Sequence, residues 1–278
     1  MSSPQNPMFD PTPAPPALGS EAPIQNATLP VAASFVENPP WTGWDVALLA
    51  VFSFLLIIIS LLGVSYTLRR VFYPSLTWID VVKQPEVIVG GQLVAYVLVF
   101  ALMYSFIAFF RRQYFFSAIQ WNWPPAWGWY VLGGLALSIG LQLFARLLPI
   151  PKDLPMDQFF RTPRQAWLLS IFSVTLAPLI EELFFRGFLY PVLARRLGMA
   201  ASVFLTALAF ASIHGAQLTY AWGPVLVIFI VGLALTLVRA IKKSVAASLI
   251  LHMAYNGTIA LAMYIGTDRF HHLERLSQ

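Results

Sequence analysis

The 278-residue sequence contains no cysteine and few charged residues. The absence of cysteine excludes disulfide bonds, thiolate metal sites and a cysteine nucleophile. Charged residues make up 10% of the chain, whereas soluble globular domains carry about 25%. A surface so poor in charge could not keep a protein of this size in solution. The composition therefore excludes a soluble enzyme and predicts a protein that crosses a membrane many times.

The two ends of the chain differ from its apolar middle. Residues 1–43 contain no lysine or arginine and many prolines, and such a segment cannot bury enough apolar surface to fold. We expect a disordered Pro-rich tail over residues 1–43, with no basic segment and apolar stretch of the kind that forms a cleavable signal peptide. The transmembrane helical domain is expected over residues 44–268, followed by a short polar tail over 269–278.

Long runs without charge fill this middle region. A helix needs about 20 apolar residues to cross a bilayer, and Leu197–Val238 is long enough to cross twice, so we expect it to break near Gly215–Pro224. The predicted fold is all-α, a polytopic transmembrane helix bundle of about seven to eight spans. The apolar runs that predict it are Trp44–Leu68, Val87–Phe110, Ala126–Ala145, Gln165–Ile180, Leu197–Val238 and Ser244–Thr267.

The formal net charge of +5 does not indicate a nucleic-acid partner. The basic residues fall between the apolar runs, where membrane topology places them. Arg69 and Arg70 after the first span favour an outside N-terminus, whereas Arg239, Lys242 and Lys243 after the sixth favour the opposite. The sequence therefore predicts a lipid bilayer as partner and no nucleic acid, and it predicts no orientation.

Strongly polar side chains within the spans are confined to the second half of the chain. An ionisable group at the bilayer centre costs about 2.5–3.5 kcal/mol on insertion scales, so its presence indicates a function. This asymmetry is the main functional indication in the sequence. The residues concerned are Glu181, Glu182, Arg186, His214, His252 and Asn256.

Two adjacent glutamates are expected to differ in role. Glu182 and Arg186 are i,i+4 neighbours on a helix and can form an ion pair. Glu181 is rotated by about 100° from Glu182 and is not aligned with that arginine. An unpaired carboxylate in apolar surroundings is suited to act as a general base. We therefore expect Glu182 and Arg186 to support a site and Glu181 to do chemistry there. The alternative is a single buried charge network with a structural role.

Two further spans contribute histidine and asparagine. Phe210 and His214 lie one turn apart, and His252 and Asn256 share one helix face. His and Asn can both donate hydrogen bonds to an oxyanion, although each could instead form interhelical hydrogen bonds. A Glu with a His can hold and deprotonate a water. Together these groups form an apparatus for peptide-bond hydrolysis without a covalent intermediate.

Zinc offers another way to activate water. Glu181, His214 and His252 could ligate Zn²⁺ with water in the open position. Asparagine is a poor zinc ligand, so the sequence favours a mechanism without a cofactor and leaves zinc as the alternative.

The three motifs resemble those of the CPBP intramembrane proteases, also called the Abi family, which includes the type II CAAX-prenyl endopeptidases. The family pattern EExxxR, FxxxH, HxxxN or HxxxD matches Glu181-Glu182-Arg186, Phe210-His214 and His252-Asn256 in this order. The similarity covers roughly residues 120–265. It implies an intramembrane endopeptidase in which Glu181 and His214 activate water, His252 and Asn256 stabilise the oxyanion, and Glu182 and Arg186 support the site.

The resemblance also implies a hydrophobic or lipidated peptide or protein as substrate, and a multi-pass protein of a membrane, here expected to be a bacterial inner membrane. Two other functions stay open. One is a proton-coupled transporter in which the same groups relay protons. The other is a non-catalytic membrane immunity or scaffold protein.

Overall fold

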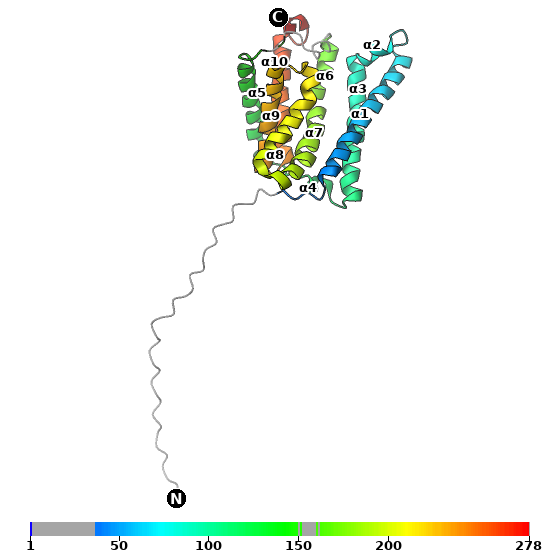
Figure 1. The fold of residues 1–278 in the computed structure, drawn as a ribbon. Helices are drawn as coiled ribbons and strands as arrows, with labels where there is room; N and C mark the ends of the chain where they lie inside the picture. The colour runs from blue at the N-terminus through cyan, green and yellow to red at the C-terminus, as the bar shows by residue number, and fades with distance from the viewer. Residues whose placement is uncertain (2–36, 150, 152–159, 161, 278) are drawn as a thin grey trace. The chain divides into compact units, whose positions relative to one another are not determined.

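The computed structural model describes residues 1, 37–149, 151, 160 and 162–277 of the chain. This part is helical and contains no strand, which confirms the predicted all-α membrane bundle (Figure 1). The α-helices are α1 (Gly43–Val71), α2 (Trp78–Val82), α3 (Pro85–Ser105), α4 (Phe115–Ala118), α5 (Trp127–Ala145), α6 (Pro163–Val174), α7 (Leu176–Glu182), α8 (Tyr190–His214), α9 (Trp222–Lys242) and α10 (Val245–Gly266). Shorter segments are the π-helices η1 (Phe106–Phe110) and η3 (Leu183–Leu189) and the 3₁₀-helices η4 (Gly215–Leu218) and η5 (Leu273–Ser277).

Six continuous helical segments of the described chain are long and apolar enough to cross a membrane. Five of them have 19 to 29 residues, and the sixth, Pro163–Leu218, has 56. A straight helix of 33 residues would separate Glu181 from His214 by about 50 Å. Their side chains lie 3.8 Å apart, so the long segment must reverse between them and can cross twice.

The reversal occurs at Gly198. This residue has φ 74° and ψ 175° within α8, outside the helical region, and only glycine adopts such a conformation without strain. No sequence pattern indicates this turn, which brings two of the site residues together. The expected break near Gly215–Pro224 is present, because η4 separates α8 from α9 there.

The span predicted to end at Ile180 instead continues through both glutamates. Helix α7 includes Glu182, and η3 carries the chain on to α8. The prediction ended the span at the first charged residue. The structure pairs Glu182 with Arg186, and this pairing lets the helical run continue through the apolar region.

The last residues of the predicted N-terminal tail contact the helical bundle. Residues 2–36 lie outside the described residues, but Glu37 and Trp41 are buried. The Trp41 indole donates a hydrogen bond to the Phe188 carbonyl, and Glu37 pairs with Arg239. These contacts fix residues 37–42 against the bundle. At the other end, Phe270 is also buried although it lies in the expected polar tail.

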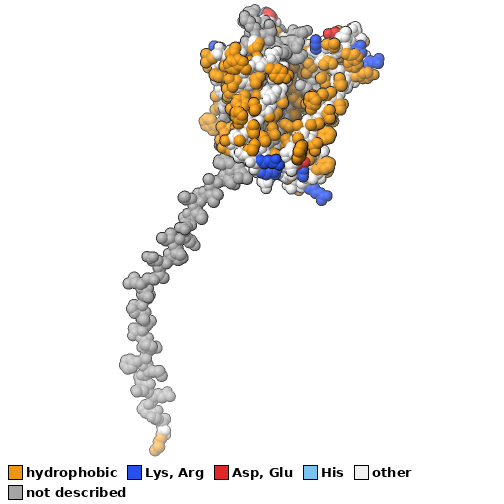
Figure 2. Space-filling view, viewed as in Figure 1, with side chains coloured by type: hydrophobic (Ala, Val, Ile, Leu, Met, Phe, Trp, Pro, Cys, Tyr) orange, Lys and Arg blue, Asp and Glu red, His pale blue; other side chains and the backbone are white. Residues whose placement is uncertain are grey.

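Helices α1 and α3 form a hairpin, and α5 to α10 form the rest of the bundle (Figure 1). Figure 2 shows hydrophobic side chains over the middle of the visible face, with lysine and arginine toward its two ends. This distribution is typical of a protein whose middle faces lipid. The largest core cluster joins the two parts, since Val46 and Met103 of the hairpin lie in it with Leu183 and Phe188.

Candidate active site

A π-helical turn carries the arginine of the first motif. In an α-helix the ring of Pro191 would clash with the carbonyl of Gly187, four residues earlier. In η3 the register is wider, and the N–H of Tyr190 bonds the carbonyl of Phe185, five residues back. The wider turn accommodates Pro191 and directs Arg186 into the core, where its side chain is fully buried. Such turns occur often at functional sites.

Glu182 is a buried carboxylate with a complete set of partners. Its Oε1 lies 2.9 Å from Arg186 Nη1 and 2.9 Å from His252 Nδ1. Its Oε2 accepts a hydrogen bond of 2.5 Å from Ser248 Oγ. None of these groups is more than 4% exposed. A buried charge is tolerated when it is paired and hydrogen-bonded in this way. The environment of Glu182 therefore fits an ionised carboxylate with a structural role.

Arg186 extends this network to α9. Its Nη2 donates to the Gly232 carbonyl at 3.2 Å and its Nε to Thr236 Oγ1 at 3.3 Å. The guanidinium carbon also lies 4.5 Å from the centre of the Phe210 ring. The Arg186 guanidinium therefore contacts α7, α8 and α9 and links these three helices.

Glu181 has a different environment. Its Oε1 lies 3.8 Å from His214 Nε2, and its Oε2 lies 3.8 Å from His252 Nε2. Both distances exceed a direct hydrogen bond and leave room for a bridging water. Glu181 and His214 each keep 18% of their side-chain surface exposed. The structure therefore brings together three of the residues predicted from the sequence.

The hydrogen bond at Nδ1 of each histidine fixes the orientation of its ring. His252 Nδ1 faces the Glu182 carboxylate, and His214 Nδ1 lies 2.8 Å from the Phe210 carbonyl. Both partners only accept hydrogen bonds, so each Nδ1 carries the proton. In the neutral rings Nε2 is then an acceptor, and both acceptors point toward Glu181.

Asn256 does not join this group directly. Its amide nitrogen donates to the Ser173 carbonyl at 2.8 Å, at the end of α6. Pro178 follows shortly and removes the backbone donor for Val174, so the amide bonds the backbone beside a helix break. His252 faces the two glutamates, so it and Asn256 have different partners in this arrangement, and their joint oxyanion site stays a prediction. An amide nitrogen has two hydrogens, which leaves one for another acceptor.

Zinc ligation is the alternative role for Glu181, His214 and His252. Zinc binds its ligands at 2.0–2.2 Å in a tetrahedron, and no group of three His, Asp or Glu side chains in the described part of the chain could hold a metal ion. In this arrangement the three side chains are not such a group, and the zinc alternative stays a prediction.

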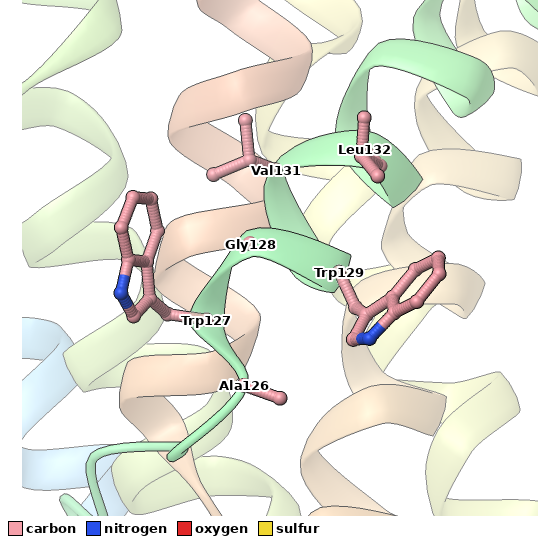
Figure 3. A pocket seen from close by; sticks show the side chains of 6 residues that line it. All are labelled: Ala126, Trp127, Gly128, Trp129, Val131 and Leu132. Carbon is pink, nitrogen blue, oxygen red and sulfur yellow. The ribbon is translucent and has the colours of Figure 1, made fainter.

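A surface depression lies at the start of α5 and shares no lining residue with this site. Ala126, Gly128, Val131 and Leu132 line it together with Trp127 and Trp129, whose rings point away from each other (Figure 3). The lining is apolar and carries no titratable group. Its tryptophans are typical of the membrane interface, so we attribute this depression to lipid contact rather than chemistry.

Part of the chain, including all of the predicted site residues, matches a known family. Residues 163–258 match the family model of Rce1-like type II CAAX prenyl endopeptidases. The match spans all three motifs and confirms the resemblance expected from them. No curated protein and no solved structure matched the chain. With its apolar helices, the match indicates an integral multi-pass membrane protein and supports an intramembrane protease of the CAAX type.

Several residues around the three motifs were not predicted from the sequence. Ser248 lies four residues before His252, as Asn256 lies four after, so the helical spacing could have identified it. Arg239 was interpreted as a topology signal beside Lys242, but it is 1% exposed and paired with Glu37. That pair is 202 residues apart in sequence, and no local pattern indicates it.

Proposed function

We propose that this protein is an intramembrane endopeptidase that hydrolyses a peptide bond with a water activated by Glu181. The observation that carries the proposal is the placement of two histidine Nε2 atoms, each 3.8 Å from a different oxygen of the Glu181 carboxylate. A water between these groups can donate one hydrogen to Glu181 and the other to a histidine. Such a water is positioned for general-base catalysis.

The proposed hydrolysis proceeds in steps, and each step uses a different group of the site. Glu181 takes a proton from the water, and the water oxygen attacks the carbonyl carbon of the substrate. His252 enters the step as an imidazolium, and its Nε2–H donates to the oxyanion together with the second N–H of Asn256 and keeps its proton throughout. Glu182 stabilises the protonated ring through Nδ1. When the carbon–nitrogen bond breaks, Glu181 returns its proton to the leaving amine.

The substrate is a hydrophobic or lipidated peptide or protein that reaches the site from the bilayer. Prenylated CAAX-type ends belong to this class, and the match to the Rce1-like family supports them. The charge-poor composition supports an origin in a bacterial inner membrane. Both refinements are part of the proposal.

The test is cleavage of a quenched fluorescent peptide with a farnesylated CAAX-type end by the purified protein in detergent. The variants are Glu181→Gln and a matched isosteric control, Glu86→Gln, at the start of α3. We expect wild type and the control to cleave and Glu181→Gln to lose about 10²–10⁴-fold in kcat. A zinc chelator should leave the rate unchanged.

Two results would contradict the proposal. Full cleavage by Glu181→Gln would show that Glu181 is not the general base. Loss of wild-type activity with the chelator, restored by Zn²⁺, would show that the mechanism depends on the metal. Ion flux through wild-type proteoliposomes without any cleavage would instead support the transporter.

A further inference from the structure

The segment Glu37–Trp41, here called the N-terminal strap, contacts the backbone of the π-helical turn η3. Trp41 is 0% exposed, and its indole donates to the Phe188 carbonyl at 3.0 Å. Its ring also lies 4.9 Å from that of Phe188. Arg195 holds the strap in place by donating to the carbonyls of Pro39 and Trp41 at 2.9 Å.

A second contact replaces a hydrogen bond that η3 cannot make. In the π register the carbonyl of Arg186 would accept from residue 191, five positions later. That residue is Pro191, which has no N–H. Arg239 Nε fills this role at 3.1 Å. A buried carbonyl without a donor is costly, so Arg239 is part of what allows the wide turn.

Glu37 holds Arg239 in this position. Its Oε1 lies 3.1 Å from Arg239 Nη1, and its Oε2 accepts from Gln120 Nε2 at 2.8 Å. Both charged side chains are nearly fully buried, with 1% of the Arg239 side chain and 2% of the Glu37 side chain exposed. Removing one would leave the other unpaired in the core. Without Glu37, the Arg239 side chain would move to bond another acceptor, and its hydrogen bond to the Arg186 carbonyl would be lost.

We propose that Glu37 is a positioning residue that acts through Arg239 on η3, and thereby on the Arg186–Glu182–His252 network. This goes beyond the family motifs, because the strap lies outside the matched residues 163–258. Its effect on rate rests on the proposed peptidase function, whereas its effect on η3 does not.

The test compares Glu37→Gln with Asp45→Asn in the full chain. Asp45 is a matched control, since it is a nearby N-terminal carboxylate paired with an arginine, Arg111, on the hairpin instead of on η3. Two readouts are needed: hydrogen–deuterium exchange of residues 183–189, and kcat and KM for the prenylated peptide. Both variants are isosteric.

We expect Glu37→Gln to speed exchange in η3 and to lower kcat at least about tenfold, as small displacements of a site do. KM should stay within about twofold of wild type because the strap bonds η3, Arg195 and Arg239, whereas Glu181 and His214 hold the partly exposed surface of the site. Asp45→Asn should match wild type in both readouts.

Unchanged exchange in Glu37→Gln would overturn the proposal, as would equal changes in both variants. If wild type cleaves nothing, the peptidase function fails, but exchange still decides: faster exchange in Glu37→Gln alone supports the positioning role, and unchanged exchange removes it.

Discussion

The α1–α3 hairpin and the α7–α10 region use different means of holding helices together within one bundle. The hairpin buries serines such as Ser60 and Ser65 but no ionisable group within α1 or α3, and its ion pair of Asp45 and Arg111 is partly exposed at one end. The α7–α10 region buries Glu182, Arg186 and Arg239 completely. Buried charges add cost rather than stability, so their confinement to one region indicates that they serve the site.

The largest effect is expected from removing a buried cation. Arg186→Met leaves Glu182 unpaired in the core and should lower the free energy of unfolding by about 3–5 kcal/mol. The matched change in the hairpin, Arg111→Met, removes a partly exposed partner and should cost about 0–1 kcal/mol. Urea unfolding in detergent measures both. Equal losses would break the distinction between the two regions.

A smaller effect is expected at Ser248. Ser248→Ala removes the hydrogen bond to Glu182 Oε2 and should destabilise the protein by about 1.5–3 kcal/mol, because bonds to charged groups are the stronger ones. The control is Ser65→Ala in α1, whose hydroxyl bonds only the Leu61 carbonyl. The same unfolding assay checks both, and a Ser65→Ala loss as large as that of Ser248→Ala would contradict the account.

Helix packing gives the smallest effect. A Cβ at Gly134 of α5 would lie 2.5 Å from the Leu251 carbonyl oxygen of α10, whereas at Gly91 of the hairpin it would lie 3.0 Å from Leu61. We expect Gly134→Ala to cost about 1–3 kcal/mol and Gly91→Ala less. Gly140→Ala meets no atom within 4 Å and should be neutral or slightly stabilising. Thermal unfolding that ranks Gly91→Ala above Gly134→Ala would contradict this order.

Much of the fold followed from the sequence, because hydropathy reports the solvent around each helix. The pairing of Glu182 with Arg186 followed as well, since charge is rare in apolar spans and the two residues lie at a fixed helical spacing. The reversal at Gly198 and the strap at Glu37 did not follow. Both depend on contacts between distant segments. No local pattern distinguishes Glu37 from the other polar residues of the Pro-rich tail.

The orientation of His252 is a further case. From spacing alone it shares a face with Asn256, which suggested a joint oxyanion site. The structure adds Glu182, 70 residues away in sequence, as the acceptor for its Nδ1. Local periodicity predicts which residues share a face, but partners across helices decide which atom points where.

The proposed function gives the two adjacent glutamates different roles, with Glu181 in the chemistry and Glu182 in the structure. Urea unfolding of Glu181→Gln and Glu182→Gln, measured together with their peptide cleavage, tests this division. We expect both to be inactive. Glu181→Gln should unfold within about 1 kcal/mol of wild type, since its carboxylate makes no close pair, whereas Glu182→Gln should lose about 3–5 kcal/mol by leaving Arg186 unpaired. A Glu181→Gln variant that retains activity, or that is as unstable as Glu182→Gln, would contradict the account.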